Sequence, residues 1–268
     1  MRNQINGVRF VYENNVAVCY IDSFSDELKE IIKIHLASIC HGQANAEELP
    51  HVYNYKSTLK EFIDRIEKKS QEIQKGMIGE LLVHILILES FSNFQTISPY
   101  FNMEEKSIRK GFDGLLYDNS IQEIWITEVK AGELHKNKCS DDTTKDLLGS
   151  AYNDLKKRLN NQEITYWRQA INSARVVIND KKDYKAAVLA ILAEEIELVV
   201  QGSAKGQDNN VIFVSILFEN LKNCFNESTP KSFLNDKSKN KEFKNLIILS
   251  VQKGTYQKVI DFFKEEQK

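Results

Sequence analysis

Two acidic residues and a lysine lie close together in the middle of the sequence, in segments that are otherwise apolar. Asp113 lies in KGFDGLLYD, and Glu128 and Lys130 end the segment IQEIWITEVK. Side chains alternate along a strand, so Glu128 and Lys130 would share one face of a sheet. Clustered carboxylates bind a hard divalent cation such as Mg²⁺ (or Mn²⁺) through oxygen. A nearby ammonium can orient or activate water and offset charge that develops on a phosphate. The pattern therefore predicts metal-assisted hydrolysis of a phosphodiester.

A third carboxylate, Glu80, lies in the almost wholly apolar segment GMIGELLVHILIL. A segment that is apolar all round predicts a helix buried on every side. A carboxylate there is costly unless it is paired, protonated or bound to a metal, so we predict that Glu80 joins Asp113 and Glu128. Two plainer interpretations stay open: Glu80 could face a polar rim, or it could meet His84 one turn further on. Gly79 lacks a side chain and would let another backbone segment approach closely.

The other residues of this set also have plainer interpretations. Asp113-Gly114 is a common hairpin turn, but Asp118-Asn119-Ser120 is a better turn five residues later, which leaves Asp113 inside an apolar strand. The spacing [DE]-x-K occurs nine times, mostly in amphipathic helices or loops. The two competitors that precede strands begin at Asp183 and Glu242, and they follow neither a hairpin with an inward acidic residue nor a buried acidic helix. Only Glu128–Lys130 has both features.

Hydrophobic periodicity and turn residues predict the elements that position these side chains. A β-hairpin is expected over residues 1–22, with its turn at Asn14-Asn15. Helices are expected over residues 23–40, from residue 57 onward, and over 77–88, where Gly76 separates the last two. Three more helices are expected over 142–160, 163–178 and 255–266. Strands are expected at 112–117, 121–130, 184–192, 211–218 and 246–251, a loop at 41–56 and a lysine-rich linker at 231–244.

This order of elements favours an α/β sandwich with a mixed central sheet. Because strands are spread along the whole chain, we predict one elaborated domain over residues 1–268. Its core would span about residues 70–195, with an N-terminal elaboration over 1–69 and a C-terminal one over 196–268.

Composition excludes several classes of protein. The chain has 268 residues, of which 42% are hydrophobic and 28% charged, enough to bury a core and too many for a disordered chain. Four separated cysteines, no secretory signal and no membrane-length apolar run predict a cytoplasmic protein with reduced thiols and no membrane partner. No histidine spacing suits zinc, and no GxxxxGK[ST] loop is present, so an ATP-driven step would belong to a partner.

The net charge of −2 hides an asymmetry between the two halves of the chain. Residues 1–134 carry 14 basic and 20 acidic side chains, whereas residues 135–268 carry 22 and 18. An acidic pocket and a basic surface can therefore coexist. Candidate DNA-phosphate contacts, which could equally be solvated surface charges, are Lys106, Arg109, Lys110, Lys156 and Lys157.

The arrangement resembles the PD-(D/E)xK nuclease superfamily. Asp113 corresponds to the D and Glu128-Val129-Lys130 to the (D/E)xK, while Phe112 stands where many members have proline. Glu80 matches an extra acidic residue that many members carry on the preceding helix. More narrowly, the segments GMIGELLVHILI, FNMEEKSIRKGFDGLLYD and IWITEVKAGE resemble the HamA family, effectors of Hachiman anti-phage systems.

The resemblance implies a restriction-endonuclease-like core and a metal-dependent, largely sequence-nonspecific DNA nuclease. In such a protein Asp113, Glu128 and Glu80 would hold the metal, and Lys130 would act on the attacking water. A helicase partner, HamB, would hold the nuclease inactive and release it on foreign or damaged DNA. Two alternatives stay open: an inactive nuclease-fold module that binds DNA or docks on a helicase, and a sequence-specific restriction-type endonuclease.

Overall fold

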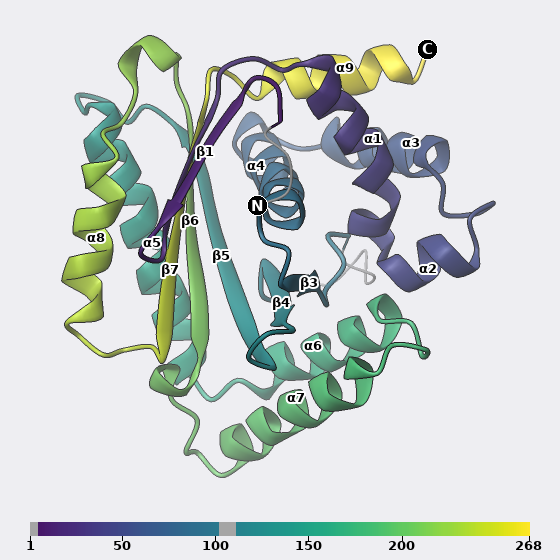
Figure 1. Ribbon diagram of the computed structural model, residues 1–268, viewed down its shortest axis with the longest axis vertical. Helices are drawn as coiled ribbons and strands as arrows, with labels where there is room; N and C mark the ends of the chain where they lie inside the picture. The colour runs from purple at the N-terminus through teal and green to yellow at the C-terminus, as the bar shows by residue number, and fades with distance from the viewer. Residues whose placement is uncertain (1–4, 102–110) are drawn as a thin grey trace.

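One mixed sheet organises the part of the chain that the computed structural model describes, residues 5–101 and 111–268 (Figure 1). Its seven strands lie in the order β1-β2-β7-β6-β5-β4-β3. They are β1 (Val8–Glu13), β2 (Val16–Ile21), β3 (Phe94–Thr96), β4 (Gly114–Asp118), β5 (Glu123–Glu133), β6 (Asn210–Phe218) and β7 (Asn245–Lys253). Neighbours from β2 through β7 and β6 to β5 are parallel, and the outer pairs are antiparallel. The expected α/β class with a mixed sheet is confirmed.

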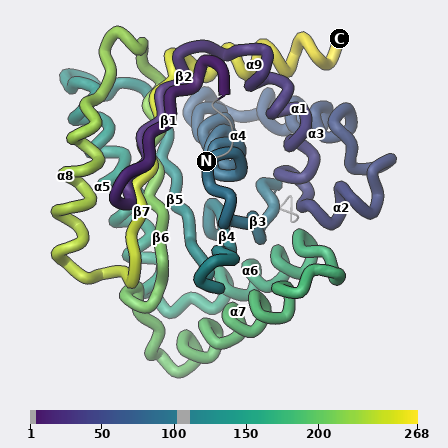
Figure 2. The backbone as a smooth tube through the Cα atoms, viewed as in Figure 1, coloured from purple at the N-terminus to yellow at the C-terminus, as the bar shows by residue number. Residues whose placement is uncertain are grey.

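Helices cover both faces of this sheet (Figures 1 and 2). One layer contains α1 (Asp26–His41), α3 (Tyr55–Ile66), α4 (Gln71–Ser90) and α9 (Gln257–Glu266). The other contains α5 (Ser140–Asn160), α6 (Ile164–Val177), α7 (Tyr184–Val200) and α8 (Ser228–Ser238). The short helix α2 (Gln43–Glu48) follows α1, and the single 3₁₀ turns Gly206–Asp208 and Leu221–Asn223 flank β6.

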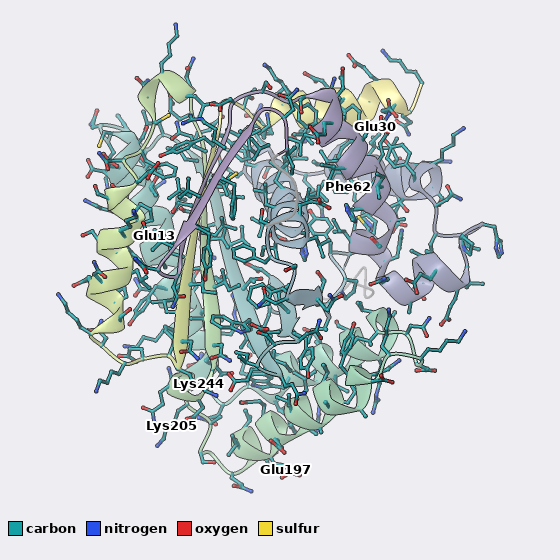
Figure 3. The ribbon with its side chains drawn as sticks, in the orientation of Figure 1. Glu13, Glu30, Phe62, Glu197, Lys205 and Lys244 are labelled. Atoms are coloured by element: carbon teal, nitrogen blue, oxygen red, sulfur yellow. The ribbon has the colours of Figure 1, made fainter. Side chains whose placement is uncertain are left out.

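Alternation along β5 divides its side chains between two cores. Val129 packs in the core between the sheet and α4, whereas Ile126 packs in the core between the sheet and α5. The first of these cores also contains Phe62 of α3 (Figure 3). Period-two alternation therefore places Glu128 and Lys130 on the α5 face of the sheet. The shared face that the sequence predicts for these two side chains is confirmed.

Local signals account for the first elements of the chain. The predicted β1–β2 hairpin is confirmed, and its turn residues Asn14 and Asn15 have φ values of 49° and 63°, which asparagine tolerates better than most residues. The side chain of Ser25 accepts a hydrogen bond from the Leu28 N–H at 3.2 Å and so caps α1. The helix predicted from residue 57 begins two residues earlier, because Asn54 forms the capping box.

The prediction of a strand over 184–192 is wrong, since these residues lie in α7. A short apolar run does not distinguish a buried strand from a buried helix, and the alanines in YKAAVLAILA favour a helix. Val188 and Leu192, four residues apart, are buried on one side of α7.

The structure also differs from the predicted elements in smaller ways. The expected loop 41–56 contains α2, and the expected linker 231–244 contains much of α8. Gly76 does not interrupt a helix, because α4 runs through it from Gln71 to Ser90. The short edge strand β3 has no counterpart among the sequence predictions.

A matched pair of glycines on α4 gives a first testable prediction. A Cβ on Gly79 would lie 2.6 Å from the Ala131 Cβ on β5, whereas a Cβ on Gly76 would meet nothing within 4 Å. We expect Gly79→Ala to destabilise the protein by about 1–3 kcal/mol, because the helix must move off the sheet. Gly76→Ala is expected to stabilise it by about 0.5–1 kcal/mol through helix propensity. Urea unfolding of both variants checks this, and equal effects would contradict the close approach of α4 to β5.

Candidate active site

The β4–β5 hairpin brings Asp113 next to Glu128. Gly114 pairs with Thr127, so Asp113, one residue before β4, comes opposite Glu128. The Asp113 Oδ2 accepts a hydrogen bond from the Val129 N–H at 2.8 Å. Asp113 was predicted inside the strand and instead lies at its entrance, where its carboxylate satisfies a backbone donor of β5. The turn predicted at residues 118–120 is confirmed, and its Asp118 Oδ1 accepts from the Ser120 N–H at 2.8 Å.

Glu128 is fully buried and holds the centre of the site. Its Oε1 accepts from the Lys130 Nζ at 2.9 Å, and Arg158 donates to both carboxylate oxygens, Nη1 to Oε2 at 2.8 Å and Nη2 to Oε1 at 3.2 Å. Burial and the neighbouring Asp113 raise the pKa of Glu128, while Arg158 and Lys130 oppose the rise. The two cations therefore offset part of the cost of burying this carboxylate.

Lys130 is held between two carboxylates. Besides Glu128, its Nζ lies 2.8 Å from the Asp154 Oδ2. Burial opposes its charge, but Glu128 and Asp154 outweigh burial and raise the pKa of Lys130 above its usual value. Lys130 is therefore a fixed ammonium, able to orient water or a phosphate oxygen, and in this state it has no free base to accept a proton.

The sequence does not predict Asp154 or Arg158 as partners of Glu128 and Lys130, and it suggests Arg158 only as a DNA-phosphate contact beside Lys156 and Lys157. Asp154 and Arg158 lie four residues apart on α5, so both side chains fall on the helix face turned to Glu128 and Lys130. The Arg158 guanidinium also lies 5.4 Å from the centre of the Tyr166 ring, which limits its movement. The only signal in the sequence was this four-residue acid–base spacing, which ordinarily marks a solvent-exposed helix pair.

Glu80 lies on α4, in the other helical layer. It is half-buried, and its carboxylate is among the charges that raise the pKa of Tyr100, after burial. His84, one turn further on, is a buried core residue, and burial alone lowers its pKa to about 4. A Cβ on Gly114 would lie 3.6 Å from the His84 ring, so this side of α4 reaches the start of β4.

Of the three predicted acidic residues, the structure brings Asp113 and Glu128 together and places Glu80 on a separate helix. That helix, α4, lies in the layer that covers the face of the sheet opposite to Glu128. Within residues 5–101 and 111–268, no three acidic, histidine or cysteine side chains gather closely enough to bind a metal. The role of Glu80 as a ligand stays a prediction.

The donor chemistry of the pair fits a divalent cation. Two adjacent carboxylates, one of them desolvated, repel each other, and a hard cation relieves that repulsion through oxygen ligands. The Glu128 Oε1 already accepts from both Lys130 and Arg158, whereas Oε2 accepts only from Arg158 and keeps one lone pair for a metal ion. Asp113 and Glu128 are the residues that would hold such an ion.

The proposed DNA contacts divide into three cases. Lys156 forms an ion pair with Glu242 at 2.6 Å, and Lys157 is exposed on α5. Lys106, Arg109 and Lys110 lie outside the described residues.

The two competing acid–lysine spacings have ordinary structural roles. Glu242 binds Lys156, and Lys244, at the start of β7 (Figure 3), binds Glu123 at 2.6 Å. Asp183 immediately precedes α7 rather than a strand, and Lys185 binds Asp180 at 2.7 Å. Of these three spacings, Glu128–Lys130 is the one that lies beside Asp113 at the entrance of β4 and pairs with Asp154 and Arg158 of α5.

These observations define an α/β protein with a charged site between a β-hairpin and the helix that follows it. The chain belongs to the HamA family, which it matches over residues 2–266. Membership supports a role in Hachiman anti-phage defence. No curated protein is significantly similar in sequence. Within the described part of the chain, no helix combines the length and the apolar character that spanning a membrane requires.

Proposed function

We propose that this protein is a metal-dependent DNA nuclease with a PD-(D/E)xK site, acting as an effector of Hachiman defence. The observation that carries the proposal is the buried carboxylate of Glu128, which lies beside Asp113 and contacts Lys130 at 2.9 Å. Burying a carboxylate beside a second carboxylate is unfavourable even with Lys130 and Arg158 as partners, and groups perturbed in this way cluster at functional sites.

The side chains have distinct roles in this proposal. Asp113 and Glu128 hold a Mg²⁺ or Mn²⁺ ion, with Glu80 completing the acidic set. The ion, when bound, polarises the phosphodiester and the attacking water. Lys130 stays protonated between Glu128 and Asp154 and therefore orients water and stabilises negative charge on the phosphate. Arg158 favours the ionised form of Glu128 until the ion is bound.

Family membership supports the remaining parts of the proposal. A helicase partner of the HamB type would supply the ATP-driven step, which the sequence lacks a phosphate-binding loop to perform. Lys157 and other exposed lysines, together with those near the Asp113 segment, would contact DNA phosphates without reading sequence.

A plasmid-degradation assay tests the proposal. Purified protein, alone and with its helicase partner, is expected to degrade supercoiled plasmid to a smear in Mg²⁺ or Mn²⁺. Chelation by EDTA is expected to stop the reaction, and readdition of the metal to restore it. The Lys130→Ala variant serves as the site control and should lose activity in the presence of the metal.

Each alternative function has its own outcome in this assay. Discrete fragments that are the same on every plasmid would indicate a sequence-specific restriction-type enzyme. DNA or helicase binding without any cleavage, in either metal and with the partner present, would indicate an inactive nuclease-fold module. Full degradation by the Lys130→Ala protein would show that the site is elsewhere.

A further inference from the structure

A second charged site lies beyond the level of Glu128, toward the carboxyl ends of the parallel strands. A pocket of about 370 Å³ opens where the parallel strands β2, β6 and β7 end. In α/β folds the carboxyl ends of parallel strands are where ligands commonly bind. The residues that line it are Ile21, Asp22, Ser23, Phe24, Asn220, Leu221, Lys253, Gly254, Thr255 and Lys258.

The pocket contains a buried ammonium that has no anionic partner within residues 5–101 and 111–268. Lys253, the last residue of β7, is only 3% exposed, and its Nζ donates to the Thr255 carbonyl at 3.0 Å. The Nζ also lies 5.1 Å from the centre of the Phe24 ring. Among the described residues, no carboxylate forms an ion pair with Lys253 or with Lys258. A buried charge normally has such a partner, so one is missing here.

Further positive charge converges on the same place. Lys258 lies in the first turn of α9, where the helix dipole favours anions and a lysine is out of place. That turn contains no acidic residue, and its first N–H group, on Gln257, donates to the Thr255 Oγ1 at 3.1 Å. Burial, followed by the charge of the exposed Lys258, lowers the pKa of Lys253 to about 8.

The acidic residue at the rim does not neutralise these groups. The Asp22 carboxylate accepts from the Arg9 Nε at 2.6 Å and from the Arg9 Nη2 at 3.0 Å. Its charge is therefore already paired with the Arg9 guanidinium. Ser23 and Thr255 add hydroxyl groups to the lining. Two ammonium groups, a helix N-terminus and hydroxyl donors suit a ligand with several oxygens and about two negative charges.

We propose that this pocket, between Lys253 at the end of β7 and Lys258 at the start of α9, binds a phosphate monoester group. The group could belong to a free mononucleotide or to the 5′ end of a DNA strand, and both present the same dianion to the pocket.

The pocket is distinct from the site around Glu128. Ile248 on β7 lies in register with Glu128 through Phe213, and Lys253 is five residues further along. That separation is about 16 Å along the strands and about 10 Å across two strand spacings. Because five is odd, Lys253 also points to the other face of the sheet, toward α9. Binding there can be tested without reference to cleavage.

Calorimetric titration of the full-length protein in EDTA, at pH 7 and fixed ionic strength, tests the proposal. The probes are inorganic phosphate, dAMP, and one single-stranded oligonucleotide with and without a 5′ phosphate. We expect phosphate and dAMP to bind. Lys253→Met should weaken binding by at least about tenfold, because it removes a charge-assisted hydrogen bond. Lys258→Ala should weaken it severalfold, while Lys264→Ala, on the same helix but outside the pocket, should change nothing.

The oligonucleotide arms identify the source of the phosphate. A DNA-end site requires tighter binding of the 5′-phosphorylated strand than of dAMP, whereas a nucleotide site requires the reverse. Lys253→Met is expected to unfold at a higher temperature than the parent in phosphate-free buffer, because it removes an unpaired buried charge, and that higher temperature verifies that the variant folds. No phosphate binding by the parent protein, or undiminished binding by a folded Lys253→Met protein, would overturn the proposal. Since EDTA prevents metal-dependent cleavage, neither result depends on nuclease activity.

Discussion

Glu128→Gln is expected to reduce the rate of metal-dependent DNA degradation by roughly a thousandfold or more. Catalytic residues that act together are not additive, so removing one of them costs nearly as much rate as removing all. Glutamine keeps the shape of the side chain but removes the negative charge that a metal ligand at this position needs. It also leaves Lys130 and Arg158 facing a neutral group in a buried site. We therefore expect a loss of stability of about 3–5 kcal/mol, typical of removing one partner from a buried ion pair.

The measurement combines initial rates of plasmid degradation with thermal unfolding of the same preparations. Asp154→Asn is the matched control, because Asp154 also contacts Lys130 but its side chain is 54% exposed. An exposed partner contributes little, so we expect less than about a tenfold loss of rate and less than about 1 kcal/mol of stability. Glu242→Gln, in a competing acid–lysine spacing, should leave the rate unchanged. Full activity of a folded Glu128→Gln protein would refute the assignment of the site.

Sequence patterns predict the strand part of this site because strand geometry is local. Alternation alone places Glu128 and Lys130 on one face, and the confirmed turn after Asp118 brings β4 back along β5. The pairing of Glu128 with Arg158 depends instead on how α5 lies on the sheet. Thirty residues separate the two, and no local pattern fixes that packing.

Apolar runs limit prediction of the fold in a similar way. Residues 211–218 and 246–251 are rich in valine and isoleucine, and they form β6 and β7 as predicted. Residues 184–192 are just as apolar but form a helix, since burial alone does not choose between the two structures. Lys253 shows a third limit: a lysine at the end of a strand is ordinarily exposed, and only the arrival of α9 and Phe24 buries it.

Arg158→Met is expected to shift the pH dependence of DNA degradation toward higher pH. Arg158 lowers the pKa of Glu128, which burial and Asp113 raise, so its removal moves that pKa further upward. A metal ligand must be ionised, so activity should fall more at pH 6 than at pH 8.5. At a pH below the raised pKa of Glu128, a tenfold increase in its proton affinity reduces the ionised fraction about tenfold.

Stability should respond to pH with a sign that follows from the same change in pKa. In Arg158→Met the folded protein binds a proton at Glu128 more tightly than the unfolded chain does. The variant should therefore lose stability relative to the parent as pH rises through the folded pKa, and recover it at low pH. A merely structural arginine would give a deficit that is constant with pH.

Two further variants separate charge from geometry at this position. Arg158→Lys keeps the charge but loses the two-pronged contact with Glu128, so it should restore most of the pH profile and only part of the maximal rate. Lys157→Met removes an exposed charge from the adjacent position of α5 and should leave the pH profile unchanged. If Arg158→Met lowered the rate equally at every pH, Arg158 would act on DNA or on folding rather than through Glu128. If the pH profile shifted as expected, a residue on α5 would set the ionisation of a carboxylate on β5, and the charge state of the proposed metal site would depend on helix packing.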